Sequence, residues 1–279
     1  TIENVNVSHN LWGTLLVKCC LNTIYGGIVL NNTYGMDLWN SDNNTIIKNM
    51  LTKCFDGIFL GGCSNNTIQG NEATNIERFC IVFDDSSNNT ILDNEVTENY
   101  AGIFLWLSSG NNIIGNTIAS NEIGICHMKG SGNNSIASNL ITENLVAIHL
   151  EASCDNIIYH NDIINNEKQV RSQDLINTWD DGYPSGGNYW SDYVGEDMKS
   201  GPNQNQPGSD GIGDTAYIMD VDNQDHYPLW YPWSLPPAEH ELAVFLEAPT
   251  IIPPGYPSLL RATVVNKGLN NETSVELLL

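Results

Sequence analysis

Proline is missing from most of this chain, because all eleven prolines lie at or after Pro184. Proline has no N–H to donate to a β-ladder, so a region whose strands are all paired on both sides should lack it. The residues before Pro184 fit such a region. The residues after it must have a different structure.

Basic residues are also scarce: 10 Lys and Arg stand against 33 Asp and Glu, which gives a formal net charge of −23. Such a charge repels phosphate backbones and anionic lipid surfaces, so we expect no nucleic acid partner and no membrane insertion by these residues. No apolar run approaches the length of about 20 residues that crosses a bilayer. The seven cysteines form no CxxC pair and no recognisable disulfide framework.

A repeating unit of 22 or 23 residues fills the first part of the chain. One copy reads Ser-Asn-Asn-Thr-Ile-Leu-Asp-Asn-Glu-Val-Thr-Glu-Asn from Ser87 to Asn99. A period of this length is typical of a solenoid, in which each repeat buries its apolar face only by stacking on its neighbours. The second Asn of each Asn-Asn-Thr-Ile-like element falls at Asn22, Asn44, Asn66, Asn89, Asn111, Asn134 and Asn156, and a second register five residues later falls at Asn49, Asn71, Asn94, Asn116, Asn139 and Asn161.

Apolar residues alternate over short stretches of each repeat, for example in Gly-Ile-Phe-Leu at 102–105. This periodicity indicates strands, about three in each repeat, with Asn, Gly and Ser at the corners between them. Coils of this kind would stack as parallel sheets about 4.8 Å apart around a narrow core of Ile, Leu and Val. Asparagines at one corner of successive coils are then expected to hydrogen-bond along the stack as a ladder.

Two further regions follow the repeats. Residues 174–238 are rich in aromatic residues, Gly, Asp and Pro, and we expect them to form a loop-rich cap on the solenoid. From residue 239 onward, strand patterns at 241–246, 258–265 and 273–279, with a turn at 266–268, predict the first part of an all-β domain. The predicted division is therefore 1–173, 174–238 and 239–279.

The repeat resembles the right-handed parallel β-helix repeats of carbohydrate-binding and sugar-hydrolase (CASH) domains, through Asn-Asn-Thr-Ile corners followed by Gly-Ile-Phe-Leu strands. The nearest likeness is to the NosD-like branch, named after an accessory protein of the copper enzyme nitrous oxide reductase. The Gly-Gly-Asn-Tyr-Trp-Ser-Asp-Tyr segment at 186–193, Asp-Gly-Ile-Gly-Asp-Thr at 210–215 and His-Tyr-Pro-Leu at 226–229 resemble the closing segment of surface proteins of that branch.

The region from His240 resembles the start of a cell-adhesion-related (CARDB-like) Ig-like domain. Together these resemblances imply an all-β protein: a right-handed parallel β-helix, a cap and a truncated β-sandwich. They also imply an exported protein, extracellular, on the cell surface or periplasmic, whose signal peptide lies outside these residues.

One solvent-facing sheet is a candidate site for carbohydrate. If the Ile at 58, 81, 103, 125 and 148 points inward, the next residue and the third residue along each strand point outward. Exposed aromatic rings beside carboxylates suit stacking on sugar rings and hydrogen bonding to hydroxyls. The aromatic segment 174–238 could instead pack on this face. The candidate carbohydrate-binding residues are Trp39, Phe59, Asp84, Phe104, Trp106 and Glu151.

The same alternation brings three soft metal ligands together. Cys126, Met128 and His149 would point outward on adjacent strands, and thiolate, thioether and imidazole together suit Cu(I). His127, between the first two, is expected to point inward as a core histidine with its hydrogen bonds satisfied.

The cap contains a third cluster, which is acidic. Carboxylates alternate with glycines and other turn residues there, in the local style of calcium loops, although neither segment matches an EF-hand. The predicted ligands of a structural Ca²⁺ are Asp210, Asp214, Asp220, Asp222 and Asp225.

No convincing catalytic set emerges from the sequence. Asp84 and Glu151 would lie three coils apart, about 14 Å, which exceeds the separation of a glycosidase carboxyl pair. The leading hypothesis is a non-catalytic surface protein that binds carbohydrate or a cell-surface polymer. The alternatives are a carbohydrate-active enzyme, either a lyase or a hydrolase, and a NosD-like copper-binding accessory protein.

Overall fold

The computed structural model describes residues 1–173, 175–234, 242–247 and 261–266, the last two segments by their backbone. The chain divides into two compact units, Thr1–Ser234 and Leu235–Leu279. In the second unit, β30 (Leu242–Glu247) and β31 (Arg261–Asn266) form an antiparallel pair. They lie close to the strands expected at 241–246 and 258–265. Residue 266, the first residue of the turn expected at 266–268, is the last residue of β31. Residues 267 and 268 and the third expected strand fall outside the described residues.

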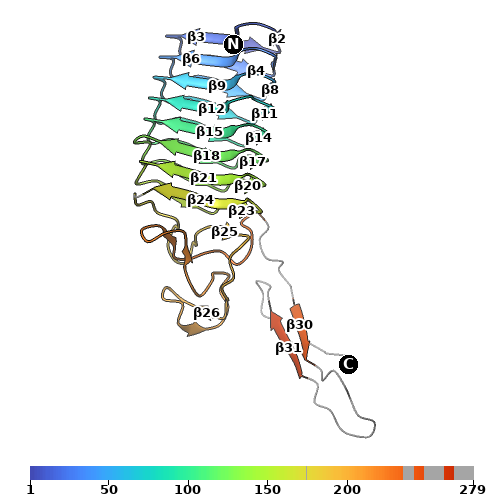
Figure 1. The fold of residues 1–279 in the computed structure, drawn as a ribbon, viewed down its shortest axis with the longest axis vertical. Helices are drawn as coiled ribbons and strands as arrows, with labels where there is room; N and C mark the ends of the chain where they lie inside the picture. Colours follow the sequence, from blue (N-terminus) through green and yellow to red (C-terminus); the bar gives the residue numbers. More distant parts are fainter. Residues whose placement is uncertain (174, 235–241, 248–260, 267–279) are drawn as a thin grey trace, which may run out of the picture. The chain divides into compact units, whose positions relative to one another are not determined.

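The first unit is a stack of coils, each of which contributes one strand to each of three parallel sheets (Figure 1). Sheet A contains β1 (Ile2–Glu3), β4 (Thr23–Tyr25), β7 (Thr45–Ile47), β10 (Thr67–Gln69), β13 (Thr90–Leu92), β16 (Asn112–Ile114), β19 (Ser135–Ala137) and β22 (Ile157–Tyr159). Sheet B contains β2 (Asn6–Ser8), β5 (Ile28–Leu30), β8 (Met50–Thr52), β11 (Glu72–Thr74), β14 (Glu95–Thr97), β17 (Thr117–Ala119), β20 (Leu140–Thr142), β23 (Asp162–Ile164) and β25 (Tyr189–Trp190).

Sheet C has the longest strands, of six residues each. It contains β3 (Trp12–Val17), β6 (Tyr34–Trp39), β9 (Asp56–Gly61), β12 (Phe79–Asp84), β15 (Ala101–Trp106), β18 (Ile123–Met128), β21 (Val146–Glu151) and β24 (Lys168–Gln173). The parallel β-helix expected from the repeat is confirmed. None of the described residues forms a helix long and apolar enough to cross a membrane.

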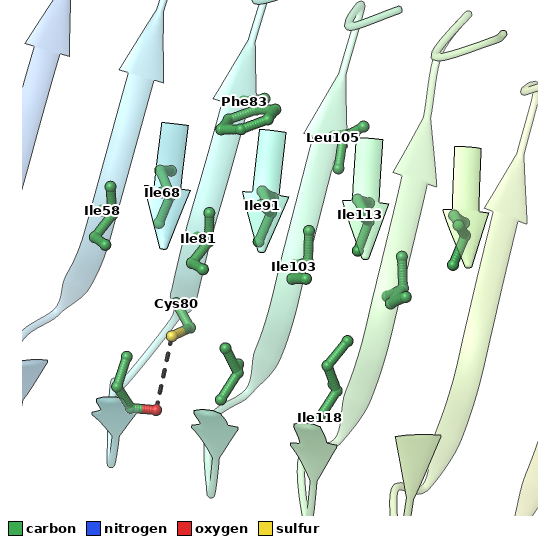
Figure 2. Packing of buried hydrophobic residues seen from close by; sticks show 14 of the residues in the cluster. Ile58, Ile68, Cys80, Ile81, Phe83, Ile91, Ile103, Leu105, Ile113 and Ile118 are labelled. Carbon is green, nitrogen blue, oxygen red and sulfur yellow. Dashed lines mark hydrogen bonds between the residues drawn. The ribbon is translucent and has the colours of Figure 1, made fainter. Parts of the chain in front are cut away.

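The core consists of columns of identical or similar side chains in register between coils. Ile68, Ile91 and Ile113 of sheet A face Ile81 and Ile103 of sheet C, and all five are buried (Figure 2). Burying a side chain of this size contributes about 1.5–3 kcal/mol. One stacked column therefore stabilises the unit more than any local turn preference can.

The asparagines at the corners form the expected ladder. The Oδ1 atom of Asn116 accepts hydrogen bonds from the backbone N–H and the side-chain amide of Asn94, both at 2.9 Å. The Asn116 amide in turn donates to Oδ1 of Asn139 at 3.0 Å and to the Ile91 carbonyl at 3.0 Å. Each buried asparagine thus satisfies backbone groups that the coil leaves unpaired where it turns.

Residues 175–234 continue this stack at its end (Figure 1). Strand β25 pairs with β23, and Asn188 extends one asparagine ladder by accepting from the N–H of Asn161 at 3.1 Å. The buried indoles of Trp179 and Trp190, 5.9 Å apart, join the core cluster. The aromatic segment therefore closes the end of the solenoid and does not cover the side of sheet C.

Short antiparallel pairs complete this closing segment: β26 (Lys199–Ser200) pairs with β27 (Gln206–Pro207), and β28 (Tyr217–Ile218) pairs with β29 (Gln224–Asp225). Its aromatic rings also pack on one another, as when Tyr217 stacks on Trp190 with ring centroids 4.2 Å apart. The composition of this segment thus serves to seal the core.

Candidate functional site on the outer face of sheet C

The outer face of sheet C carries three columns of side chains where simple alternation predicts two. In β15, Ile103 and Leu105 point into the core, while Phe104 and Trp106 belong to a separate outer cluster. A Cβ atom on Gly102 would meet the core side chains of Ile118 and Val96, so this position also faces inward. Gly102 and Ile103 are thus two successive residues that both face inward. This shifts the in–out alternation of the strand by one residue, so the first residue of each strand faces outward.

This phase change creates a cleft near the first coils. The cavity has a volume of about 300 Å³. It is lined by Trp12, Tyr34, Asp37, Trp39, Asp56, Phe59 and Arg78. Its size lies at the lower end of the range for small-ligand sites. Its lining combines aromatic rings with a few polar groups, as such sites usually do.

Two aromatic pairs form the walls of the cleft. Trp12 stacks on Tyr34 with ring centroids 6.0 Å apart, and Trp39 packs against Phe59 at 4.8 Å. A Cβ atom on Gly61 would lie 2.8 Å from ring carbons of Trp39, so the indole lies flat over this glycine. The side chain of Trp39 remains 41% exposed. Trp39 therefore offers a supported aromatic surface to a ligand.

Asp37 is the polar group of the cleft that is least committed to the protein. It is only 4% exposed, and its Oδ2 accepts a hydrogen bond from Nε1 of Trp12 at 3.1 Å. Its Oδ1 is buried and has no hydrogen-bond partner. Burial raises the pKa of Asp37 to about 6, against the opposing effect of the Trp12 hydrogen bond, and the charge of Asp56 adds to the rise. A ligand hydroxyl could satisfy Oδ1.

Asp56, in contrast, is committed to Arg78. Nε of Arg78 donates to Oδ1 of Asp56 at 2.8 Å, and a second guanidinium nitrogen donates to Oδ2. The guanidinium also lies 4.8 Å from the ring centroid of Phe79 and 4.9 Å from that of Phe55. The pair is thus a bidentate ion pair held between aromatic rings, which fixes one side of the cleft.

The structure places only Trp39 and Phe59, of the six predicted carbohydrate-binding residues, in this cleft. Phe104 is 9% exposed and stacks on Phe79 with centroids 4.3 Å apart, so it presents no free face. Nζ of Lys129 lies over the ring of Trp106, 4.3 Å from its centroid, so the lysine covers one face of this ring.

The two predicted carboxylates lie outside the cleft. Asp84 is in register with Gly61 and Trp106, and burial, followed by the charge of Asp85, raises its pKa. Glu151 is in register with Met128, further along the stack. Neither carboxylate lines the cleft with Trp39 and Phe59.

Four cleft residues were not predicted from the sequence: Trp12, Tyr34, Asp56 and Arg78. The first three are the first residues of their strands, and alternation counted back from the inward Ile would place them inside. The glycine that follows Trp12, Tyr34 and Asp56 is the signal that could have located them, because it marks the change of phase.

The predicted copper ligands lie further along the same face. Cys126 and His149 are in register on β18 and β21, and the Cys126 Sγ lies 3.8 Å from Nδ1 of His149. Met128 packs against the outer cluster that contains Cys126. Burial raises the pKa of Cys126 to about 12, and burial followed by the charge of Arg171 lowers the pKa of His149.

His127 points into the core, as expected, at a position that other coils fill with Leu or Phe. Burial lowers its pKa to about 4, so the imidazole is neutral. The expectation that its hydrogen bonds are satisfied is wrong, because both ring nitrogens are buried and neither has a hydrogen-bond partner. His127 thus takes the place of a hydrocarbon side chain.

The carboxylates of the acidic loops accept hydrogen bonds from backbone N–H groups. Asp210 accepts from Gly201 at 3.1 Å, Asp214 from Lys199 at 2.9 Å and Asp220 from Asp222 at 2.9 Å. Asp225 is buried and accepts from the N–H of Asn188 at 2.7 Å. Within the described ranges, no three His, Cys, Asp or Glu residues are grouped so as to hold a metal ion. The structure therefore gives no support to the predicted calcium site.

Comparisons with known proteins agree with this fold. A family model described as periplasmic copper-binding protein (NosD) matches residues 1–139 and again residues 80–195. A search of curated protein sequences finds no match.

Among solved structures, the chain is similar to the periplasmic alginate epimerase AlgG (TM-score 0.53, 18% identity, 61% of this chain and 49% of that chain). It is also similar to the A-module of the Azotobacter vinelandii mannuronan C-5 epimerase AlgE6 (TM-score 0.50, 13% identity, 63% of this chain and 57% of that chain). The chain thus spans about half the length of these structures, and at such identities the likeness concerns the fold alone.

Proposed function

The chain belongs to the NosD family, and we propose that it is a periplasmic or extracellular β-helix protein that binds a neutral carbohydrate in the cleft on sheet C. The observation that carries the proposal is the buried carboxyl of Asp37, whose Oδ1 has no partner, in a cleft walled by two aromatic pairs. A sugar ring offers an apolar face for Trp39 and hydroxyls for Asp37.

The charge of the protein favours a neutral ligand. The formal net charge is −23, and two carboxylates line the cleft. The cation of the cleft, Arg78, is already paired with Asp56. An acidic polysaccharide would therefore meet repulsion without a free positive charge to bind it.

Binding is favoured over hydrolysis by the state of the two cleft carboxyls. Glycosidases usually need one carboxyl as acid and a second that is free to act as base or nucleophile. Asp37 has the raised pKa, about 6, that suits an acid, but both oxygens of Asp56 accept from Arg78. The cleft residues thus offer one uncommitted carboxyl group.

The test is binding of the full chain to an array of neutral oligosaccharides, with alginate oligomers as the acidic comparison. Trp39→Ala should weaken binding about 10–100-fold, the range for losing a buried aromatic contact at the centre of a binding site. Trp106→Ala is the matched control, because this aromatic lies on the same sheet face outside the cleft.

Two outcomes would contradict the proposal. One is binding to neutral sugars that Trp39→Ala leaves unchanged. The other is failure of the folded protein to bind any neutral oligosaccharide of the array. Asp37→Asn is a second variant for the same binding assay, because it keeps the size of the side chain and replaces one carboxyl oxygen with an amide nitrogen.

A further inference from the structure

The cleft on sheet C has a second property, which does not depend on carbohydrate binding: its rings and carboxyl groups are arranged as an aromatic cage. Along β6, the carboxyl of Asp37 lies between two aromatic residues of the outer face, Tyr34 and Trp39. Trp12 of β3 stacks on Tyr34 and extends one wall, and Phe59 of β9 packs against Trp39 and extends the other. Four aromatic rings thus flank one carboxyl group.

The faces of the cleft rings are not occupied by cations of the protein. Within the described residues, guanidinium and ammonium groups lie over Phe55, Phe79 and Trp106, and none of these rings lines the cleft. Trp12 and Trp39, one on each wall, are 42% and 41% exposed. An indole face attracts a cation more strongly than the rings of Tyr and Phe do. The cleft therefore offers two indole surfaces to a cation from solution.

The charged groups of the cleft leave one negative charge uncompensated. Asp56 forms an ion pair with Arg78, so these two charges balance each other. Asp37 accepts the neutral indole N–H of Trp12, and the ion pairs of the described residues do not include it. A neutral sugar could hydrogen-bond to Asp37 but would leave this charge in place. A monovalent cation would balance it without touching the buried Oδ1, because an opposite charge acts on a carboxylate over about 4–6 Å.

The walls select the kind of cation. A primary ammonium group carries three N–H donors, which need acceptors when they leave water, and aromatic rings accept hydrogen bonds poorly. A quaternary ammonium ion has no N–H, and its methyl groups can pack directly on the ring faces. The cavity of about 300 Å³ suits a small solute. The formal net charge of −23 would repel a ligand that also carried a carboxylate or a phosphate.

We propose that the cleft binds a small quaternary ammonium ion of the choline type, with the trimethylammonium group between Trp12 and Trp39 and its charge balanced by Asp37. No covalent bond changes on binding. The rest of the ligand is neutral, because the protein has no unpaired cation in the cleft to receive an anionic group.

The ionised form of Asp37 is the form that attracts the cation. Burial raises the pKa of Asp37 to about 6, so affinity should increase as the pH rises through this value. The other ionisable groups that line the cleft are Tyr34 on the same strand, Asp56 on β9 and Arg78 just before β12, and the last two are paired with each other. The cleft residue of β3, Trp12, does not titrate.

The test is isothermal titration calorimetry of the full chain with choline and with its neutral isostere, the alcohol in which a tert-butyl group replaces the trimethylammonium group. Choline should bind at least about 10-fold more tightly, because the two molecules differ in charge and hardly in shape. Choline binding should weaken about 10-fold from pH 7.5 to pH 5, whereas binding of the alcohol should not change.

Three variants separate the charge, the ring and the rest of the sheet. Asp37→Asn keeps the size of the side chain and should weaken choline binding more than about 10-fold, with no effect on the alcohol. Trp39→Leu keeps an apolar side chain but removes the indole face, and should weaken choline binding about 3–30-fold. Trp106→Ala is the control outside the cleft and should bind choline as the natural chain does.

The proposal is overturned if the folded chain binds choline no more tightly than the alcohol, or if Asp37→Asn, with an unchanged melting temperature, binds choline as tightly as the natural chain. If Asp37→Asn does not fold, the comparison of choline with the alcohol at the two pH values decides. Tighter binding of phosphocholine than of choline would contradict the neutral remainder of the ligand.

The two proposals for the cleft fail separately. A chain that binds neutral oligosaccharides but not choline contradicts the quaternary ammonium site alone. A chain that binds choline but no oligosaccharide of the array contradicts carbohydrate binding alone.

Discussion

Replacing Asn116 by alanine should destabilise the β-helix strongly, although the change removes only three heavy atoms. The side chain accepts two hydrogen bonds from Asn94 at 2.9 Å and donates to Ile91, Ile114 and Asn139 at 3.0 Å. All these contacts lie at a buried corner. Alanine leaves the backbone N–H of Asn94 without an acceptor, and it removes one donor from each of the two carbonyls.

The size of the effect follows from the number of groups left unpaired. Each buried polar group that loses its partner costs about 1–3 kcal/mol. With one N–H orphaned and the carbonyls and neighbouring amides partly unpaired, we expect a loss of about 3–5 kcal/mol in unfolding free energy. For a unit of this size, that loss lowers the melting temperature by about 6–20 °C.

The measurement is thermal and urea unfolding followed by circular dichroism. Asn112→Thr is the control, because Asn112 lies on the solvent side of β16 in register with Thr90. This change should alter stability by less than about 0.5 kcal/mol. If Asn116→Ala costs no more than the control, the ladder does not stabilise the coil and the reasoning is wrong.

Two further predictions concern the same unit. Asp37 and Asp225 have pKa values raised by burial to about 6 and about 7, above the usual value of 3.8, so the folded state holds more protons than the unfolded state between these values. Their contribution to stability therefore falls as pH rises from about 4 to about 7. The difference between the melting temperatures at pH 5 and at pH 7.5 should be smaller in Asp37→Asn and in Asp225→Asn than in the natural chain. If this difference is unchanged in both variants, the raised pKa values are contradicted. Gly57→Ala should cost about 1–3 kcal/mol in unfolding free energy, because the new Cβ would lie 2.2 Å from the Cys80 carbonyl oxygen. Ala147→Gly, at a position where alanine already fits, should cost less than about 1 kcal/mol by the same unfolding assay, and a cost equal to that of Gly57→Ala would refute the steric argument.

Several features of the fold could be predicted because they repeat at short range. The spacing of Asn44 and Asn66 gave the length of a coil, and the Ile at 58, 81 and 103 gave the inward side of sheet C. Repetition makes such predictions safe, since each coil has the same partners as the next. The absence of proline before Pro184 likewise marked the strands that are paired on both sides.

The cleft could be predicted only in part. Trp39 and Phe59 follow the simple alternation, and both line the cavity. Trp12 and Asp56 precede the glycine at which the strand changes phase, and simple alternation would place them on the wrong side. Arg78 lies just before β12, and only the folded chain shows that it reaches back one coil to Asp56.

The sequence by itself determined the period, the corner chemistry and the inward columns of this protein, because these follow from short-range patterns that each coil repeats. Only the tertiary structure decided which outward residues form a site. That decision depends on stacking, since Trp12, Asp37, Asp56 and Arg78 come from four successive coils and meet only when the coils lie in register. It also depends on packing, which buries Phe104 against Phe79 and leaves Trp39 exposed over Gly61.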